Sequence, residues 1–265
     1  METTATVSTQ TDAPVLLDRH DGVATVTLNR PRQYNALSNA VLDELQRMLD
    51  TIATDATVRV VVVAGSGPAF CAGHDLKEMR AHYELEATRE LFAKCSRMMQ
   101  TLIDIPQPVI AKVHGIATAA GCQLVAQCDL AVASENARFA TSGINFGLFC
   151  STPSVPLARN VGRKQAMEML LTGNFVDAAT ALRHGLLNRV VPEADLDGAV
   201  AEIVRTIVAK PADAVAMGKR LFYRQVEMPL AQAYDLAADT MACNFMLPNA
   251  AEGVDAFMQK RPPRW

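Results

Sequence analysis

The feature that most constrains the fold is an uninterrupted run of four valines at residues 60–63, which ends in a turn of glycine and proline at residues 65–68. β-Branched apolar residues without polar alternation are typical of a strand covered on both faces, as in a parallel sheet. A loop of small residues, 71–73, then leads through His74 into a predicted helix. Backbone N–H groups at a helix start are unpaired and suit a negatively charged oxygen.

A second segment repeats this arrangement. Residues 109–113 have the pattern of a buried strand, and the small residues of segment 114–121 follow it into another predicted helix. Two such loops can aim two backbone N–H donors at one carbonyl oxygen, which is the geometry of an oxyanion hole. Strands and helices alternate as far as about residue 153, and this order favours an α/β fold with parallel strands and right-handed crossovers.

Hydrophobic periodicity predicts the remaining elements. Further strands are expected at residues 15–18, 23–29, 130–133 and 139–140, and the Asp-Gly pair at 21–22 joins the first two as a hairpin. Helices are expected at residues 38–53 (with Ser38 as N-cap), 85–102, 119–128, 156–172, 177–183, 195–209, 212–226, 230–246 and 250–260. We divide the chain into a disordered tail (1–13), a core (14–200) and a C-terminal helical region (201–265).

Composition excludes several classes of protein. The chain has 265 residues, of which 50% are hydrophobic, so it can build one large core or a core with an appended helical unit. A net charge of −3 with scattered basic residues gives no indication of nucleic-acid binding. Apolar runs are too short to cross a bilayer, and residues 1–13 lack the features of a signal or transit peptide. We therefore expect a cytoplasmic protein without a membrane span.

The six cysteines form no CxxC pair and no cluster with histidine that has metal-ligand spacing. Buried, reduced thiols are the interpretation that fits this distribution. We expect no metal site and no resident cofactor.

Four stretches, residues 29–37, 69–76, 114–124 and 257–261, together resemble the crotonase superfamily, also called the enoyl-CoA hydratase/isomerase family. The resemblance extends over nearly the whole chain. Residues 116–124 and 147–153 are most similar to its enoyl-CoA hydratase domain-containing branch. The resemblance implies a crotonase-like spiral of ββα units, a helical C-terminal part that forms trimers, and pairing of trimers into hexamers.

The resemblance also implies a coenzyme A thioester as substrate or ligand. Its carbonyl oxygen would accept hydrogen bonds from the backbone N–H groups of His74 and Ala120, and we interpret the imidazole of His74 as a packing group. Asp75 is interpreted as a helix cap rather than an acid–base group. The coenzyme-contacting positions implied by the resemblance are Arg32, Ala72, His74, Asp75, Leu76, Phe257 and Lys260. Of these, Arg32 would pair with the phosphates, and Phe257 and Lys260 would close the nucleotide end, from the same or a neighbouring subunit.

The sequence departs from the family at the catalytic acids. A hydratase of this family uses two glutamates, and the matching positions here hold Gln123 and Gly143. Glutamine can orient a water molecule but has no carboxylate to accept a proton, and glycine has no side chain. The residues expected near the acyl group that could substitute are Cys122, Ser142, Asn145, Cys150 and Ser151, and for each of them we favour a packing role.

These observations predict an acyl-CoA enzyme of the enoyl-CoA hydratase/isomerase type, a lyase that stabilises a thioester enolate with two backbone N–H groups. Ordinary two-glutamate hydration is doubtful for this sequence. Two alternatives stay open: an acyl-CoA-binding protein without hydratase activity, and a crotonase-type thioester hydrolase or decarboxylase. The sequence leaves open the acyl group and the choice between trimer and hexamer.

Overall fold

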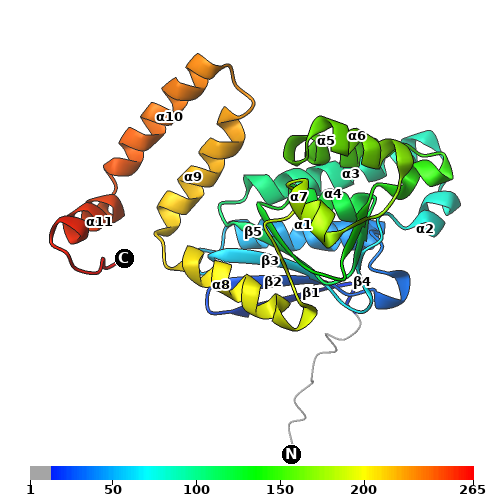
Figure 1. The fold of residues 1–265 in the computed structure, drawn as a ribbon, viewed down its shortest axis with the longest axis horizontal. Coiled ribbons are helices and arrows are strands. Elements are labelled where there is room, and N and C mark those ends of the chain that lie inside the picture. Colours follow the sequence, from blue (N-terminus) through cyan, green and yellow to red (C-terminus); the bar gives the residue numbers. More distant parts are fainter. Residues whose placement is uncertain (1–12) are drawn as a thin grey trace, which may run out of the picture.

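The computed structural model describes residues 13–265, so the predicted N-terminal tail lies outside the described residues except for its last position. Two sheets form in the described part of the chain (Figure 1). The larger sheet has the strand order β1 (Val15–His20), β2 (Val23–Leu28), β3 (Val60–Gly65), β5 (Val109–Val113), β7 (Leu130–Ser134) and β10 (Arg189–Val191). The smaller sheet has the order β4 (Ala69–Cys71), β6 (Ile116–Thr118), β8 (Arg138–Ala140) and β9 (Val176–Asp177).

A repeating unit of two strands and a helix relates the two sheets. In each unit the first strand joins the larger sheet and the second joins the smaller sheet, as in the pairs β3–β4, β5–β6 and β7–β8. Helical segments follow each pair: α2 (Leu76–Ala81) and α3 (Leu85–Asp104), then α4 (Ala120–Gln127), then the 3-10 helix η3 (Ser142–Phe146). Neighbouring strands of successive units pair in parallel. This is the predicted spiral of ββα units, which is confirmed.

The valine run is buried on both faces of the larger sheet. Val61 and Val63 join the core cluster that includes α1 (Asn39–Ala53) and α3, whereas Val60 and Val62 pack against α8 (Leu196–Val208) on the opposite face. Covering both faces removes the need for polar alternation, which explains the uninterrupted valines. Helix α1 begins as predicted, because the Ser38 side chain accepts a hydrogen bond from the Val41 N–H at 3.3 Å.

The predicted helix at residues 156–172 is wrong in its extent. Two helices occupy this region, α5 (Ser151–Asn160) and α6 (Arg163–Thr172). Val161 is extended between them, with φ −109° and ψ 143°, and Gly162 caps α6. Apolar periodicity continues across this break, so the sequence pattern alone did not reveal it. The short strands β4, β6 and β9 were also not predicted, since runs of two or three residues carry little periodicity.

The C-terminal helices project from the sheet-containing body (Figure 1). Helices α9 (Ala212–Gln225) and α10 (Leu230–Phe245) form a hairpin that α11 (Pro248–Met258) follows, while the short α7 (Ala178–Arg183) stays with the body. A buried polar cluster fastens α9 to the core: the Lys219 ammonium lies 2.8 Å from the Asp129 carboxylate, which also accepts from the Tyr223 hydroxyl at 2.8 Å.

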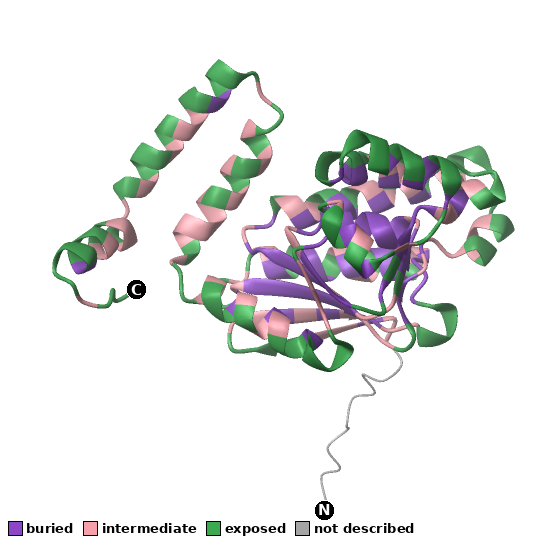
Figure 2. Ribbon diagram, in the orientation of Figure 1, coloured by how far each residue is buried: buried purple, intermediate pink, exposed green. Residues whose placement is uncertain are grey.

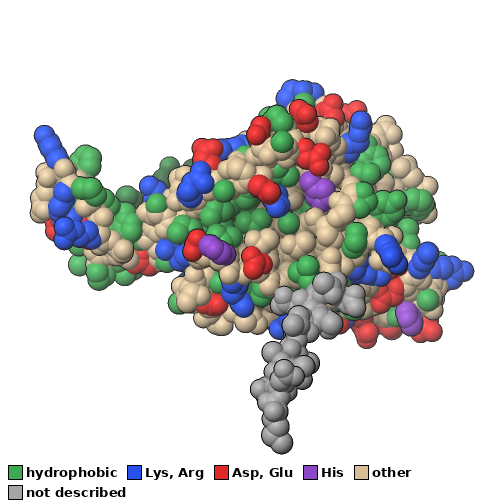
Figure 3. All heavy atoms as spheres, turned by 90° about the horizontal axis from the view of Figure 1, so that it is seen from below, with side chains coloured by type: hydrophobic (Ala, Val, Ile, Leu, Met, Phe, Trp, Pro, Cys, Tyr) green, Lys and Arg blue, Asp and Glu red, His purple; other side chains and the backbone are tan. Residues whose placement is uncertain are grey.

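The projecting hairpin exposes many apolar side chains. Most of its surface is not buried in Figure 2, and hydrophobic side chains lie along the region that joins it to the body in Figure 3. The larger exposed side chains include Phe222 (56% exposed), Leu230 (74%), Tyr234 (70%), Met241 (76%) and Phe245 (63%). Among the described residues, none of the helices combines the length and apolarity needed to cross a membrane.

Candidate functional site

A cavity of about 300 Å³ lies where the β4–α2 loop, the start of α4 and the η3–α5 segment meet. Ala72, His74 and Leu76 line it from the first loop, Ala119 and Ala120 from the second, and Gly143 from the third segment. These segments are far apart in the sequence. The two loops that sequence analysis paired therefore do border one cavity.

The two loops touch each other at the cavity. Gly73 has φ +93°, and a Cβ placed there would lie 3.3 Å from the Ala120 nitrogen and 2.9 Å from the Ala119 Cβ. Glycine is required by both the backbone angle and this close approach. The contact brings the backbone of Gly73 and His74 directly beside the first residue of α4.

Backbone N–H groups of both loops are available at this contact. Ala120 is the first residue of α4, so its N–H has no acceptor within the helix. Within residues 13–265, no hydrogen bond is donated by the N–H of His74 or of Ala120. Ala119 precedes Ala120 with φ +50° and ψ −120°, a conformation that costs an alanine about 1–3 kcal/mol. This conformation of Ala119 sets the direction of the Ala120 N–H.

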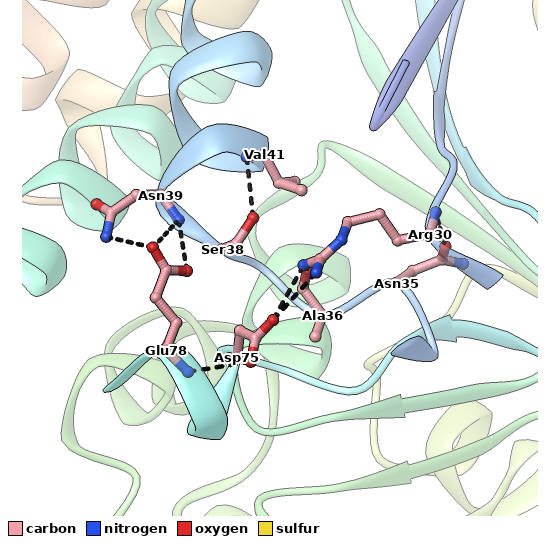
Figure 4. Close-up of polar contacts among 8 residues, drawn as sticks. All are labelled: Arg30, Asn35, Ala36, Ser38, Asn39, Val41, Asp75 and Glu78. Atoms are coloured by element: carbon pink, nitrogen blue, oxygen red, sulfur yellow. Dashed lines mark hydrogen bonds and ion pairs between the residues drawn. The ribbon is translucent and has the colours of Figure 1, made fainter. Parts of the chain in front are cut away.

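An ion pair holds the His74 loop in place (Figure 4). The Arg30 guanidinium donates to one carboxylate oxygen of Asp75 at 3.1 and 3.2 Å and to the Ala36 carbonyl at 3.0 Å. The other Asp75 oxygen accepts from the Glu78 N–H at 3.3 Å and caps α2. The Glu78 side chain in turn accepts from the Asn39 N–H at 3.1 Å. Both carboxylate oxygens of Asp75 therefore accept hydrogen bonds from the protein, one from Arg30 and one from the Glu78 N–H. Asp75 caps α2, as predicted, and holds the loop against Arg30.

The position that matches the second glutamate is physically closed. A Cβ at Gly143 would lie 2.5 Å from the Leu148 carbonyl oxygen and 2.8 Å from the Cys150 sulfur. The Gly143 N–H donates to that sulfur at 3.3 Å. Cys150 thus occupies the space into which a side chain at residue 143 would extend. Burial raises the pKa of the Cys150 thiol, with the Gly143 N–H opposing this effect, so the group is a protonated thiol at neutral pH.

Gln123, at the position of the first glutamate, is 4% exposed and is not among the residues that line the cavity. Its Oε1 has no hydrogen-bond partner among the described residues. The described residues of the cavity wall include no Asp, Glu, Lys or Arg. The wall therefore offers no carboxylate to move a proton.

Sequence analysis missed six apolar residues of this wall. They come from α2, α3 and the η3–α5 segment, and they are Met79, Phe92, Phe146, Leu148, Phe149 and Pro153. One signal was available, because Phe146, Leu148 and Phe149 are large apolar residues clustered around Gly147 in a loop. Phe146 stays 72% exposed at the cavity.

His74 is among the residues that line the cavity, and both nitrogens of its ring are shielded from solvent. Its ring makes an edge-to-face contact with Phe92, with centroids 5.3 Å apart and planes at 83°. Burial lowers the pKa of His74, while the Leu37 carbonyl and the Glu78 carboxylate act in the opposite direction. The imidazole is therefore neutral at pH 7.

Four of the seven predicted coenzyme contacts, namely Arg32, Asp75, Phe257 and Lys260, are not among the residues that line this cavity. Arg32 is exposed on the 3-10 helix η2 (Pro31–Gln33). Phe257, on α11, is 85% exposed, and Lys260 follows that helix. In Figure 1 α11 lies at the opposite end of the molecule from α2. The fold of one chain brings together Ala72, His74, Leu76, Ala120 and Gly143, but not Phe257 or Lys260.

The class of protein follows from this fold and from comparison with known proteins. The chain belongs to the enoyl-CoA hydratase/isomerase family, whose profile matches residues 18–265, and the predicted resemblance is confirmed. It is similar to the enoyl-CoA hydratase domain-containing protein 3, mitochondrial, of Rattus norvegicus, with 45% identity over 93% of this chain and 82% of the relative.

Two solved structures have the same fold as this chain. The crystal structure of an enoyl-CoA hydratase from Mycobacterium smegmatis is 60% identical, with a TM-score of 0.94 over 95% of this chain and 98% of that chain. The crystal structure of human enoyl-CoA hydratase domain-containing protein 3 is 45% identical, with a TM-score of 0.93 over 95% of this chain and 100% of that chain.

The comparisons contradict the expected cytoplasmic location. The curated relatives with 43–46% identity, from rat, mouse, frog, human and zebrafish, are named as mitochondrial proteins. The expectation rested on the lack of signal-peptide and transit-peptide features in residues 1–13, and the names of these relatives contradict it.

Proposed function

We propose that this chain binds acyl-CoA thioesters in the cavity at the start of α4 and stabilises an enolate-like thioester oxygen with the N–H groups of His74 and Ala120. One observation carries the proposal. Two unpaired N–H groups from separate loops border one apolar cavity, and a strained Ala119 sets the direction of one of them. Among the described residues of the cavity wall there is no Lys or Arg, so these two N–H groups are the donors that would polarise a carbonyl.

The chemistry follows from where charge develops. Removing a proton from the carbon beside a thioester, or adding a nucleophile to its conjugated double bond, moves negative charge onto the carbonyl oxygen. Preorganised backbone donors in a water-poor site lower the barrier of such a step by about 3–4 kcal/mol per donor. The N-terminal end of α4 adds a favourable dipole at the same oxygen.

Hydration by two glutamates is not part of this proposal. Gln123 has no carboxylate and lies outside the wall, and the space beside Gly143 is filled. Loss of general acid–base help costs about 10²–10⁴-fold for each group. The uncharged wall favours a second candidate, an acyl-CoA-binding protein without hydratase activity, over a hydrolase that needs a base beside its water.

Binding and turnover are tested separately. Calorimetry should show that butyryl-CoA binds at least about fivefold more tightly than S-butyl-CoA, a thioether with no carbonyl to accept the two hydrogen bonds. Hydration of crotonyl-CoA should run at least 100-fold below a typical turnover of about 10 s⁻¹. Equal affinity for thioester and thioether would refute the N–H pair. Fast hydration with a bell-shaped pH profile would reveal an acid–base pair elsewhere in the pocket.

We also propose that the chain assembles as a homotrimer or as a pair of trimers through its C-terminal helices. The α9–α10 hairpin exposes more large apolar side chains than an isolated projection can keep in water. Assembly is also the arrangement that would allow Phe257 and Lys260 of one copy to reach the coenzyme of another. Light scattering at micromolar concentration should give a trimer or a hexamer, and a stable monomer would contradict the proposal.

A further inference from the structure

The segment of residues 30–37 is hydrogen-bonded to the loop that carries His74. The Leu37 N–H donates to the Gly73 carbonyl at 2.8 Å, and the Leu37 carbonyl accepts from the Asp75 N–H at 3.2 Å. Leu37 and His74 therefore form an isolated parallel β-bridge. In such a bridge the two hydrogen bonds go to the residues on either side of His74, so the N–H of His74 itself points away from the paired segment. The bridge thus sets the direction of one of the two proposed oxyanion donors.

The Arg30 guanidinium spans this bridge (Figure 4). It donates to the Ala36 carbonyl at 3.0 Å and to one carboxylate oxygen of Asp75 at 3.1 and 3.2 Å. Ala36 precedes one side of the bridge and Asp75 follows the other, so a single planar group with several donors joins the two sides. The side chains of Arg30 and Asp75 are 24% and 16% exposed, and salt and water screen such a partly buried pair less than a surface pair.

Asn35 fixes the turn from which the Arg30 side chain extends. Its Oδ1 accepts from the Arg30 N–H at 2.8 Å, and its Nδ2 donates to the carbonyls of Ser66 and Ala69 at 2.8 and 2.7 Å. Asn35 is 1% exposed and has φ +56°, a left-handed conformation that asparagine adopts more readily than most residues. The turn is therefore tied to the β3–β4 connection, and the guanidinium reaches Asp75 from a fixed base.

We propose that Arg30 is a positioning residue: through its ion pair with Asp75 it holds the His74 N–H in the direction that a thioester carbonyl requires. The inference rests on the proposed function, because it assigns a role to a donor of that site. Arg30 is not among the residues that line the cavity, so it acts through the loop and not on the ligand. Loss of the ion pair frees the loop, and a donor that is no longer preorganised contributes less to carbonyl binding. A purely structural role for Arg30 predicts lower stability with no change in carbonyl recognition.

The test compares calorimetric affinities for butyryl-CoA and for the thioether S-butyl-CoA, which lacks the carbonyl. The preference of the wild-type protein for the thioester, about fivefold or more, should fall to about twofold or less in Arg30→Met, which keeps a long apolar side chain but no donor. Asp75→Asn should give the same loss, because its amide oxygen can still cap α2 but the charge is gone. The double variant should show no further loss, since the two side chains act as a pair. Arg30→Lys keeps the charge and should retain more of the preference than Arg30→Met.

Arg189→Met is the matched control. It removes a guanidinium that lies 2.9 Å from the Glu202 carboxylate, and neither residue lines the cavity, so the wild-type preference should persist. Melting followed by circular dichroism shows which variants are folded during the titration, and Asp75→Asn decides the question if Arg30→Met does not fold. A folded Arg30→Met or Asp75→Asn protein with the full wild-type preference would overturn the inference. Equal affinity of the wild-type protein for both ligands would instead refute the N–H pair itself, so the two failures are distinguishable.

Discussion

Replacing Gly143 with alanine tests whether the space of the second catalytic acid is closed. The added methyl would lie 2.5 Å from the Leu148 carbonyl oxygen and 2.8 Å from the Cys150 sulfur, whereas ordinary contacts begin at 3.4 Å. Relief requires a shift of about 0.9 Å (3.4 − 2.5) by a backbone carbonyl. That carbonyl belongs to a loop tied to Gly143, because the Leu148 N–H donates to the Gly143 carbonyl at 3.0 Å.

Overpacking of this kind costs about 1–3 kcal/mol of unfolding free energy. For a chain of this length each kcal/mol lowers the melting temperature by about 2–4 °C, so Gly143→Ala should melt about 2–12 °C below wild type. The matched control is Gly198→Ala in α8, where nothing lies within 4 Å of the added Cβ. The same change there should stabilise the helix by up to about 1 kcal/mol.

Melting followed by circular dichroism, with denaturant titration for the free energy, gives both values. Cys150→Ala removes one of the two close contacts, so the cost of Gly143→Ala should fall in that background. A Gly143→Ala protein that melts at or above the wild-type temperature would show that the loop yields freely. The site could then accept an acid, and the closed-space reasoning would be refuted.

Three further outcomes are expected. The double variant Gln123→Glu/Gly143→Glu should gain no crotonyl-CoA hydration over Gln123→Glu alone, because the second side chain has no space; a gain would contradict the packing described for Gly143. Arg32→Ala and Lys260→Ala should each weaken calorimetric affinity for CoA by about 3–10-fold through loss of a phosphate contact, and unchanged affinities would show that the predicted placement is wrong. Since burial holds the pKa of His74 below its ordinary value of 6.5, the unfolded chain binds a proton that the folded chain does not, and unfolding free energy should fall as pH drops below about 6.5. That part of the pH dependence should be absent from denaturant titrations of His74→Phe.

Local sequence patterns were sufficient for the scaffold of the site. The valine strand, the small-residue loops before His74 and Ala120, and the Ser38 cap are local features whose backbone preferences do not depend on distant residues. The pairing of the two loops could also be expected, because parallel strands in successive units end at the same edge. The helix break at Gly162 was not predictable from periodicity, which continues through it.

Contacts between segments that are distant in the sequence determine which chemical groups the cavity presents. Absence of glutamate at residues 123 and 143 is visible in the sequence, but only the fold shows that Cys150 and the Leu148 carbonyl occupy the vacated space. Only the fold shows that the His74 ring packs against Phe92 and that neither ring nitrogen has a hydrogen-bond partner among the described residues. Backbone conformation follows from neighbours along the chain, whereas desolvation and steric exclusion depend on neighbours in space, and these are set only when the chain has folded.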